Sequence, residues 1–260
     1  MQTLRAKKFL GQHFLKNEEI AETIAHSIAG YDTFEKVVEI GPGMGVLTKY
    51  LLNYFHEKLF VVELDRDSVP YLQEHFPELE HRIIEGDFLQ MDMQEMFDKP
   101  TAVIGNYPYN ISTQILFKVF ENHNQVPLFS GMFQKEVAAR VASKPGNKEY
   151  GILSVLLQAF YDIEYLFTVS ELEFDPPPRV KSGVMRMVHK SNTSLACNEV
   201  FFKEIIKAAF NQRRKTLRNG LKQIAQRNNK QHVLENEIFN KRAEQLSWEA
   251  YVELANMLAV

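Results

Sequence analysis

The sequence predicts an α/β protein in which a parallel β-sheet is followed by a small all-α domain at the C-terminus. Three observations predict this class. From about residue 36 onward, short apolar runs alternate with segments of helical spacing. Residues 41–45 read Gly-Pro-Gly-Met-Gly, directly after the first of these runs. Beyond residue 198 the apolar residues follow helical spacing alone. Strands that alternate with helices form parallel sheets with right-handed crossovers.

Each predicted element rests on its own local pattern. Ile20, Ile24 and Ile28 recur at helical spacing over residues 17–29, and Gly30 ends that helix. Apolar runs predict strands at 36–40, 59–64, 82–87, 102–106, 131–133 and 184–188, with helices at 46–52, 68–76 and 135–143 and a further apolar segment at 154–160. The polar stretch 191–194 is typical of a linker, so we expect one domain at 1–190 and a helical domain at 198–260.

Composition excludes several classes of protein. With 45% hydrophobic and 24% charged residues, the 260-residue chain is neither disordered nor collagen-like. Cys197 is the single cysteine, which excludes an internal disulfide or a cysteine-based zinc cluster and favours a reducing compartment. We see no apolar run of about 18 residues and no signal peptide, so we expect a cytoplasmic protein with no membrane partner.

The charge is unevenly distributed, although the net charge is only −3. The first 16 residues contain four basic side chains and no acidic one: Arg5, Lys7, Lys8 and Lys16. Residues 176–230 contain 13 basic side chains against Glu199 and Glu204 alone. Such a split predicts a surface that binds a polyanion. The alternative is an ordinary solvated helical surface.

Three features at successive strand ends indicate a nucleoside site. The glycines of loop 41–45, notably Gly41 and Gly43, let a ligand approach the backbone beside a helix N-terminus, and the spacing does not match the dinucleotide pattern. Glu63 ends the next strand, where a carboxylate accepts hydrogen bonds from both ribose hydroxyls. Asp87 ends the third strand and is placed to accept one from an exocyclic amino group. A tight structural turn would explain the glycine loop by itself, but not the two carboxylates.

Residues 106–109, Asn-Tyr-Pro-Tyr, follow the fourth strand. An ordinary Asn/Pro turn is one interpretation. The other is chemical: the amide oxygen of Asn106 and the carbonyl at Pro108 both accept hydrogen bonds from a planar amino group. Tyr109 offers a ring on which an unstacked base gains roughly 1–3 kcal/mol. We therefore expect these residues to hold an amine that faces an electrophile.

Taken together, the motifs resemble the ribosomal RNA adenine dimethyltransferases. They occur in order along the chain at 11–15 (Gly-Gln-His-Phe-Leu), 39–43 (Glu-Ile-Gly-Pro-Gly), 63–65 (Glu-Leu-Asp), 86–87 (Gly-Asp), 106–113 (Asn-Tyr-Pro-Tyr-Asn-Ile-Ser-Thr) and 174–180 (Phe-Asp-Pro-Pro-Pro-Arg-Val). Residues 210–219 (Phe-Asn-Gln-Arg-Arg-Lys-Thr-Leu-Arg-Asn) resemble the small-subunit branch of this family. The resemblance covers nearly the whole chain.

The resemblance implies a Rossmann-like fold dependent on S-adenosylmethionine, with S-adenosylhomocysteine as product and no metal. The implied reaction dimethylates N6 of two adjacent adenosines near the 3′ end of small-subunit rRNA. The family's cofactor contacts correspond to His13, Leu15, Gly41, Gly43, Glu63, Asp87 and Asn106. Asn106, Pro108, Tyr109 and Phe174 form the predicted catalytic set, with adenine between the rings of Tyr109 and Phe174, although Phe174 is equally well explained as a core aromatic.

The implied partner is small-subunit rRNA within the immature 30S subunit, bound by a monomer with a role in subunit biogenesis. Seven basic residues are expected to contact phosphates: Arg179, Lys181, Arg213, Arg214, Lys215, Arg218 and Lys222. RNA shape and an accessible single-stranded loop would then supply specificity.

Two positions depart from the family's pattern, and three other functions compete. His13 is often Asn in the family, and Tyr107 is usually Leu or another apolar residue.

A large-subunit rRNA methyltransferase of the resistance type would share the catalytic motifs, but residues 210–219 argue against it. A DNA adenine methyltransferase would need sequence-reading elements that we do not find. A ribosome-assembly factor without catalysis would not need Glu63, Asp87 and Asn106.

Overall fold

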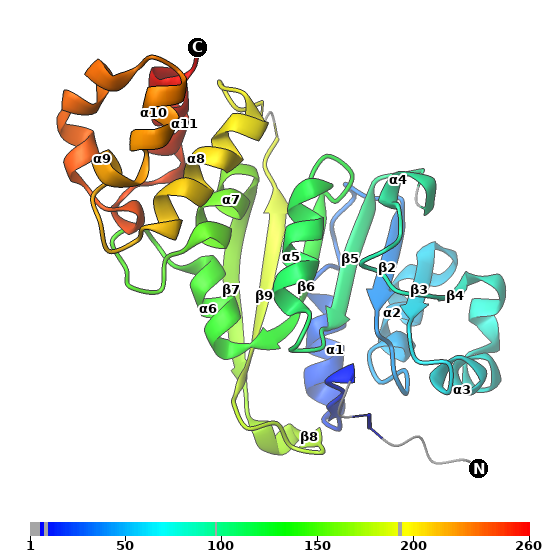
Figure 1. Ribbon diagram of the computed structural model, residues 1–260. Coiled ribbons are helices and arrows are strands. Elements are labelled where there is room, and N and C mark those ends of the chain that lie inside the picture. Colours follow the sequence, from blue (N-terminus) through cyan, green and yellow to red (C-terminus); the bar gives the residue numbers. More distant parts are fainter. Residues whose placement is uncertain (1–5, 8–9, 97, 192–193) are drawn as a thin grey trace. The chain divides into compact units, whose positions relative to one another are not determined.

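The computed structural model describes residues 6–7, 10–96, 98–191 and 194–260 (Figure 1). Arg5 and Lys8 of the predicted basic N-terminus lie outside these ranges. The chain forms two compact units. Unit 1 comprises residues 1–138 and 163–189, and unit 2 comprises 139–162 and 190–260. Within the ranges given above, no helix is both long and apolar enough to span a bilayer.

Unit 1 is built on a seven-stranded sheet with the order β4-β3-β2-β5-β6-β9-β7. Its strands are β2 (Lys36–Ile40), β3 (Leu59–Glu63), β4 (Ile83–Glu85), β5 (Thr101–Asn106), β6 (Leu128–Gln134), β7 (Tyr161–Val169) and β9 (Ser182–His189). The pairs from β4 through β6 are parallel, and β9 runs antiparallel to β6. A separate two-stranded ribbon joins β1 (Phe14–Leu15) to β8 (Phe174–Asp175).

Helices of unit 1 follow the strands in the expected alternation. They are α1 (Glu18–His26), α2 (Thr48–Phe55), α3 (Ser68–His75), α4 (Met93–Met96) and α5 (Ser112–Glu121), with short 3₁₀ helices at His56–Lys58, Pro77–Arg82 and Glu171–Glu173. The side chain of Asn17 caps α1 by accepting a hydrogen bond from the Ile20 N–H. Helix α6 (Lys135–Ala142) starts in unit 1.

Unit 2 is helical. It contains α7 (Ile152–Phe160), α8 (Glu199–Asn211), α9 (Leu217–Gly220), α10 (Lys222–Arg227) and α11 (Trp248–Leu258), with 3₁₀ helices at Gln231–Glu235, Glu237–Asn240 and Ala243–Gln245. Helix α7 is apolar around most of its circumference and groups with the C-terminal helices, not with the sheet that precedes it. These units describe packing, so the functional domains 1–190 and 198–260 stay a prediction.

The predicted strands and helices correspond to observed elements, with two kinds of difference. The observed β6 and β9 are longer than the predicted 131–133 and 184–188. Both strands include a buried serine, Ser130 in β6 and Ser182 in β9, and a search for apolar runs does not include these polar residues. The sequence analysis missed the helices α4 and α5, the strand β7 and the ribbon of β1 with β8. Strand β7 alternates exposed and half-buried residues weakly, and the ribbon strands have only two residues each.

Both faces of the sheet are buried. Val37, Val61 and Ile104 belong to one apolar cluster that also contains residues of α1 and α2. Their neighbours Val38 and Val103 point to the opposite face and are equally buried. This explains why the strands read as continuous apolar runs without polar alternation.

Tyr107, one of the departures from the family's pattern, is a core residue. Its side chain is 1% exposed, its hydroxyl donates to the carbonyl oxygen of Ser130 at 2.8 Å, and its ring stacks on Phe129 at 5.1 Å. Glycines make room for this ring. Gly131 has φ +146°, and a Cβ there would lie 2.2 Å from the Gly105 carbonyl oxygen and 2.5 Å from the Tyr107 ring.

We predict that Gly131→Ala destabilises the protein by more than about 3 kcal/mol, because the added methyl group meets backbone that cannot move away. Gly30→Ala is the matched control, since φ there is +81° but no atom lies within 4 Å of the new Cβ. That change should cost only the backbone strain of about 1–2 kcal/mol. Urea unfolding measures both, and equal losses would contradict the steric explanation.

Candidate active site

The chain reverses its direction of progress across the sheet between β2 and β5. From β2 it proceeds through β3 to β4, and from β5 it proceeds the other way to β6. In open α/β sheets, ligands bind outside the carboxyl ends of the strands at such a switch point. A cavity lies there, lined by residues 10–15, 39–44, 46–47, 62–64, 86–88 and 106–111. All of these residues belong to unit 1.

The glycine loop and Glu63 are joined directly. Glu63 ends β3 and is 4% exposed, and its carboxylate accepts hydrogen bonds from the Gly43 N–H at 3.0 Å and the Asp65 N–H at 2.8 Å. Burial raises the pKa of Glu63 above its ordinary value, and these two backbone donors oppose the rise. Gly43 has φ +57°, and a Cβ there would lie 3.0 Å from the ring of Phe14. The loop is therefore a tight cradle for a ligand beside a fixed carboxylate.

A second buried carboxylate, Glu39, lines the same cavity. It is 1% exposed within β2, and the Thr48 hydroxyl donates to its Oε2 at 2.6 Å. Burial raises the pKa of Glu39 to about 8, and the nearby negative charge of Glu63 adds to the rise. Glu39 is thus protonated at neutral pH, and it shares the cavity with the carboxyl groups of Glu63 and Asp87.

Asp87 lies in a loop that Lys118 anchors. The Asp87 Oδ1 accepts a hydrogen bond from the Leu89 N–H at 2.9 Å, which leaves the other carboxylate oxygen to face the cavity. The Lys118 amine donates to the carbonyl oxygens of Leu89, at 3.1 Å, and Met91. It also lies over the Phe88 ring. One lysine on α5 therefore fixes the loop that carries Asp87.

The amide of Asn106 is oriented by the N-terminal segment. Its Nδ2 donates to the His13 carbonyl oxygen at 3.1 Å, while its Oδ1 has no hydrogen bond to any described residue. The Pro108 carbonyl accepts from the Ile111 N–H at 3.2 Å and keeps a second lone pair. Two acceptors are thus available at the carboxyl end of β5.

Tyr109 lies beside these acceptors, half-buried. Its hydroxyl is 2.6 Å from the Ser182 hydroxyl, and its ring centroid is 5.5 Å from that of His13. Burial raises the pKa of the Tyr109 hydroxyl, so it stays neutral and contributes chiefly a fixed ring. His13 in turn contacts the Pro176 carbonyl oxygen through Nδ1 at 2.7 Å.

Phe174 does not line the cavity. It pairs with Leu15 across the two-stranded ribbon, is 1% exposed, and packs in the apolar cluster that covers one sheet face. Stacking on a base needs an accessible ring face, which this arrangement does not provide. The core-aromatic interpretation of Phe174 describes its position, and the predicted sandwich is left with Tyr109 alone.

The structure brings together every predicted cofactor residue, and it separates the basic residues into two groups. His13, Leu15, Gly41, Gly43, Glu63, Asp87 and Asn106 all line the one cavity, together with Pro108 and Tyr109. Arg179 and Lys181 are exposed on unit 1, between β8 and β9. Arg214, Lys215, Arg218 and Lys222 are exposed on unit 2.

Arg213 differs from its basic neighbours. Its guanidinium donates to the Lys148 carbonyl oxygen and lies 3.7 Å from the Glu244 carboxylate. Arg213 therefore links two segments of unit 2. Among the described residues, no group of three or more His, Cys, Asp or Glu side chains is arranged to hold a metal ion. That the protein needs no metal stays a prediction.

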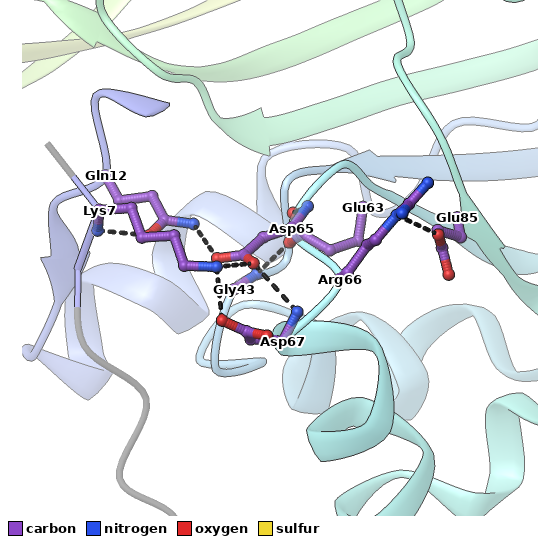
Figure 2. A network of polar contacts seen from close by, with 8 residues as sticks. All are labelled: Lys7, Gln12, Gly43, Glu63, Asp65, Arg66, Asp67 and Glu85. Atoms are coloured by element: carbon purple, nitrogen blue, oxygen red, sulfur yellow. Dashed lines mark hydrogen bonds and ion pairs between the residues drawn. The ribbon is translucent and has the colours of Figure 1, made fainter. Parts of the chain in front are cut away.

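Sequence reasoning missed four polar residues around the cavity. Glu39 could have been predicted from the sequence, because a carboxylate inside an apolar strand must have a partner or a function. Lys7, Gln12 and Asp65 form a network next to Glu63 (Figure 2). Nothing local in the sequence links Lys7 to a residue 58 positions away.

The fold and the cavity define the class of Rossmann-like methyltransferases. Among solved structures, the chain is similar to a dimethyladenosine transferase from Plasmodium falciparum, with a TM-score of 0.78 and 24% identity over 93% of this chain and 96% of the other. It is also similar to the 23S rRNA methyltransferase ErmE, with a TM-score of 0.67 and 22% identity over 94% and 99%. At these identities, both comparisons establish the fold.

Sequence comparisons identify the family. The family model for ribosomal RNA adenine dimethylase matches residues 3–260, so the chain belongs to that family. Proteins named ribosomal RNA small subunit methyltransferase A are similar over the full length. The one from Cytophaga hutchinsonii is 53% identical over 100% of this chain and 99% of its own, and the one from Parabacteroides distasonis is 56% identical over 98% and 94%. The chain is thus an rRNA adenine dimethyltransferase.

The raised pKa of Glu39 predicts how stability depends on pH. Between about pH 5 and 8 the folded protein keeps this proton and the unfolded chain has lost it, so Glu39 lowers the free energy of unfolding by up to about 1.4 kcal/mol per pH unit as pH rises. Glu39→Gln should remove this slope. The free energy of unfolding of the variant, relative to that of the wild type, should therefore increase with pH until about pH 8. Urea unfolding of both proteins at pH 5.5, 7 and 8.5 measures the difference.

Glu18→Gln is the control for this measurement. The exposed Glu18 accepts a hydrogen bond from Lys49, which lowers its pKa, so any contribution is lost as pH falls and has the opposite sign. A constant difference between Glu39→Gln and wild type across the three pH values would show that Glu39 is already ionised.

Proposed function

We propose that the cavity of unit 1 binds S-adenosylmethionine and that the enzyme dimethylates N6 of two adjacent adenosines near the 3′ end of small-subunit rRNA. The observation that carries this proposal is the set of polar groups at four neighbouring strand ends. The glycine loop after β2, Glu63 at the end of β3, Asp87 after β4, and the acceptors of Asn106 and Pro108 at and after the end of β5 surround one cavity.

The residues fit the cofactor that the family implies. Glu63 is fixed by two backbone donors and keeps further lone pairs for two ribose hydroxyls, and Asp87 keeps an oxygen for the adenine amino group. Leu64 is 49% exposed at the cavity, an unusual position for leucine that suits packing against a purine. The Gly43 position leaves space that a side chain would fill.

When bound, S-adenosylmethionine supplies an electrophilic methyl carbon on a sulfonium, which needs no metal and no activated nucleophile. The task left to the chain is alignment of the attacking amine. Asn106 Oδ1 and the Pro108 carbonyl accept the two N6 hydrogens and direct the nitrogen lone pair toward the cavity. The bond from N6 to the methyl carbon forms as the carbon–sulfur bond breaks, and the extra N6 proton leaves to water.

Tyr109 holds the target base after it leaves the RNA stack. Its ring is fixed by Ser182 and flanked by His13, so it offers a preformed stacking platform. The rings of His13, Phe14, Phe88 and Tyr107 also line the cavity, and Tyr109 is the ring assigned to the target base because it directly follows Asn106 and Pro108. The first product still carries one N6 hydrogen, which either acceptor binds, so the same geometry serves the second methylation.

The exposed basic residues support an RNA partner. Those of unit 2 lie at and after the end of α8, and those of unit 1 lie in the loop before β9. We propose that residues 198–260 bind RNA, that the substrate is the immature 30S subunit, and that the enzyme acts as a cytoplasmic monomer. The small-subunit name of the full-length relatives supports this substrate over large-subunit rRNA. The complete set of polar groups around the cavity favours a catalytic protein over an inactive assembly factor.

Incubation of undermethylated small subunits with labelled S-adenosylmethionine, followed by mapping of the modified bases, tests the substrate directly. Label on two adjacent adenosines near the 3′ end would support the proposal. Label on large-subunit rRNA or on DNA would replace it with one of the alternatives.

We predict that Asn106→Ala lowers the single-turnover rate of methyl transfer about a hundredfold or more, because N6 loses its acceptor, while the Kd for S-adenosylhomocysteine changes less than about tenfold. Asn124→Ala makes the same chemical change at an exposed position of unit 1 that does not line the cavity, and it should leave both values near those of the wild type. Comparable losses of transfer and cofactor binding in Asn106→Ala would refute the assignment.

The RNA surface of unit 2 gives a separate prediction. Arg214→Glu with Lys215→Glu should weaken binding to small subunits and reduce the salt slope of log K by about 2, since each residue neutralises one phosphate. Arg213 is left intact because it stabilises unit 2. The matched control reverses the exposed Lys58 and Lys99 of unit 1. Unchanged affinity and slope in the first variant would identify the surface as merely solvated.

A further inference from the structure

We propose that Asp65 is a positioning residue that fastens the N-terminal segment to the cofactor cavity through Lys7 and Gln12. This inference rests on the proposed function, because it concerns the same cofactor. The Asp65 cluster consists of Lys7, Gln12, Asp65 and Asp67 (Figure 2). None of these side chains carries a predicted role in catalysis or cofactor contact.

Asp65 receives three hydrogen bonds from two parts of the chain. Its Oδ1 accepts from the Lys7 amine at 2.5 Å and from the Asp67 N–H at 3.0 Å, and its Oδ2 accepts from the Gln12 amide at 3.1 Å. The side chain of Asp65 is only 3% exposed. A carboxylate so buried is stable only when it is paired, so the N-terminal residues complete this site.

Lys7 also forms hydrogen bonds to other residues of the N-terminal segment. The Lys7 N–H donates to the Gln12 Oε1 at 2.8 Å, and the Lys7 carbonyl accepts from the Leu10 N–H at 3.0 Å. Lys7 and Gln12 are therefore linked to each other, and their side chains both donate to Asp65. Residues 10–15 line the cavity and include His13 and Leu15.

The other side of Asp65 reaches the ribose carboxylate. Its backbone N–H donates to the Glu63 Oε1 at 2.8 Å, while the Gly43 N–H holds Oε2. Figure 2 shows Asp65 between Glu63 on one side and Lys7 and Gln12 on the other. Asp65 and Glu63 together thus link three segments that line the cavity: the glycine loop, the end of β3 and the N-terminal segment.

The charges explain why a lysine is used. Lys7 also pairs with Asp67 at 2.6 Å, so one ammonium group faces two carboxylates. Burial by itself would raise the pKa of Asp65, but the hydrogen bonds from Lys7 and Gln12 outweigh it and the pKa is lowered. Without Lys7, Asp65 and Asp67 would lack their cation next to Glu63. The N-terminal segment would also lose its ion pair to Asp65.

The proposal predicts a specific pattern of variants. Lys7→Met should raise both the Kd for S-adenosylhomocysteine and the KM for S-adenosylmethionine about tenfold and leave kcat at saturation within twofold, because bound cofactor holds residues 10–15 in place and the Asn106 amide then keeps its His13 acceptor. Asp65→Asn should act in the same direction. The double variant should be no worse than the more damaging single one, since each change opens the same attachment. Lys7→Arg should recover most of the affinity.

Lys36→Met is the matched control. Lys36 pairs with Asp98 at 2.7 Å and lies at the amino end of β2, whereas the cavity lies at the carboxyl ends of the strands. It should leave cofactor binding unchanged. Hydrogen exchange of the cofactor-free protein gives a second measurement: Lys7→Met should speed the exchange of amides in residues 10–15, with the remaining strands protected as in the wild type.

The outcomes separate this inference from the function beneath it. Failure of the wild type to bind S-adenosylhomocysteine would overturn the proposed function. Tight binding by the wild type together with unchanged binding and exchange in Lys7→Met and Asp65→Asn would overturn the positioning role alone. A loss in kcat instead of KM, or additive losses in the double variant, would also overturn it.

Discussion

The two backbone hydrogen bonds to the Glu63 carboxylate are the interaction on which the rest of the cavity depends. They join the glycine loop after β2 to the residues after β3, and parallel strand pairing places those two segments side by side. A carboxylate buried at this point needs donors, and the backbone of Gly43 and Asp65 supplies them. The cradle is therefore formed before any ligand enters it, which lowers the entropic cost of binding.

Three carboxyl groups lie close together at this end of the sheet, and each is stabilised differently. Glu39 keeps its proton, because burial and the charge of Glu63 outweigh the hydrogen bond from Thr48. Glu63 depends on backbone donors, and Asp65 depends on Lys7 and Gln12. Because Glu39 is protonated, this division avoids three adjacent negative charges in a buried site.

The chemistry proposed for the site needs few reactive groups, and the structure has few. A sulfonium donor leaves the enzyme only the alignment of an amine, so an amide, a prolyl carbonyl and a tyrosine ring suffice. The acceptors are held by ordinary contacts: Asn106 by the His13 carbonyl, and Tyr109 by Ser182. In the proposed function the cavity carries the reaction, and the exposed basic residues supply the affinity for a large polyanion.

The sequence by itself determined the alternating strands, the glycine loop and the polar residues at the strand ends. These are local signals: a buried parallel strand is a continuous apolar run, and a residue directly after it must lie at one edge of the sheet. Gly43, Glu63, Asp87 and Asn106 could be placed together for this reason. The motif order along the chain was also enough to indicate the family.

Only the tertiary structure decided which aromatic ring faces the cavity and which polar groups support it. The ribbon of β1 with β8 buries Phe174, and paired glycines on β5 and β6 turn Tyr107 into the core. Arg213 pairs with Glu244, and Lys7 pairs with Asp65, which lies 58 positions away along the chain. The burial of these rings and the pairing of these charges depend on how distant segments align with one another. The spacing of residues along a single chain does not determine that alignment.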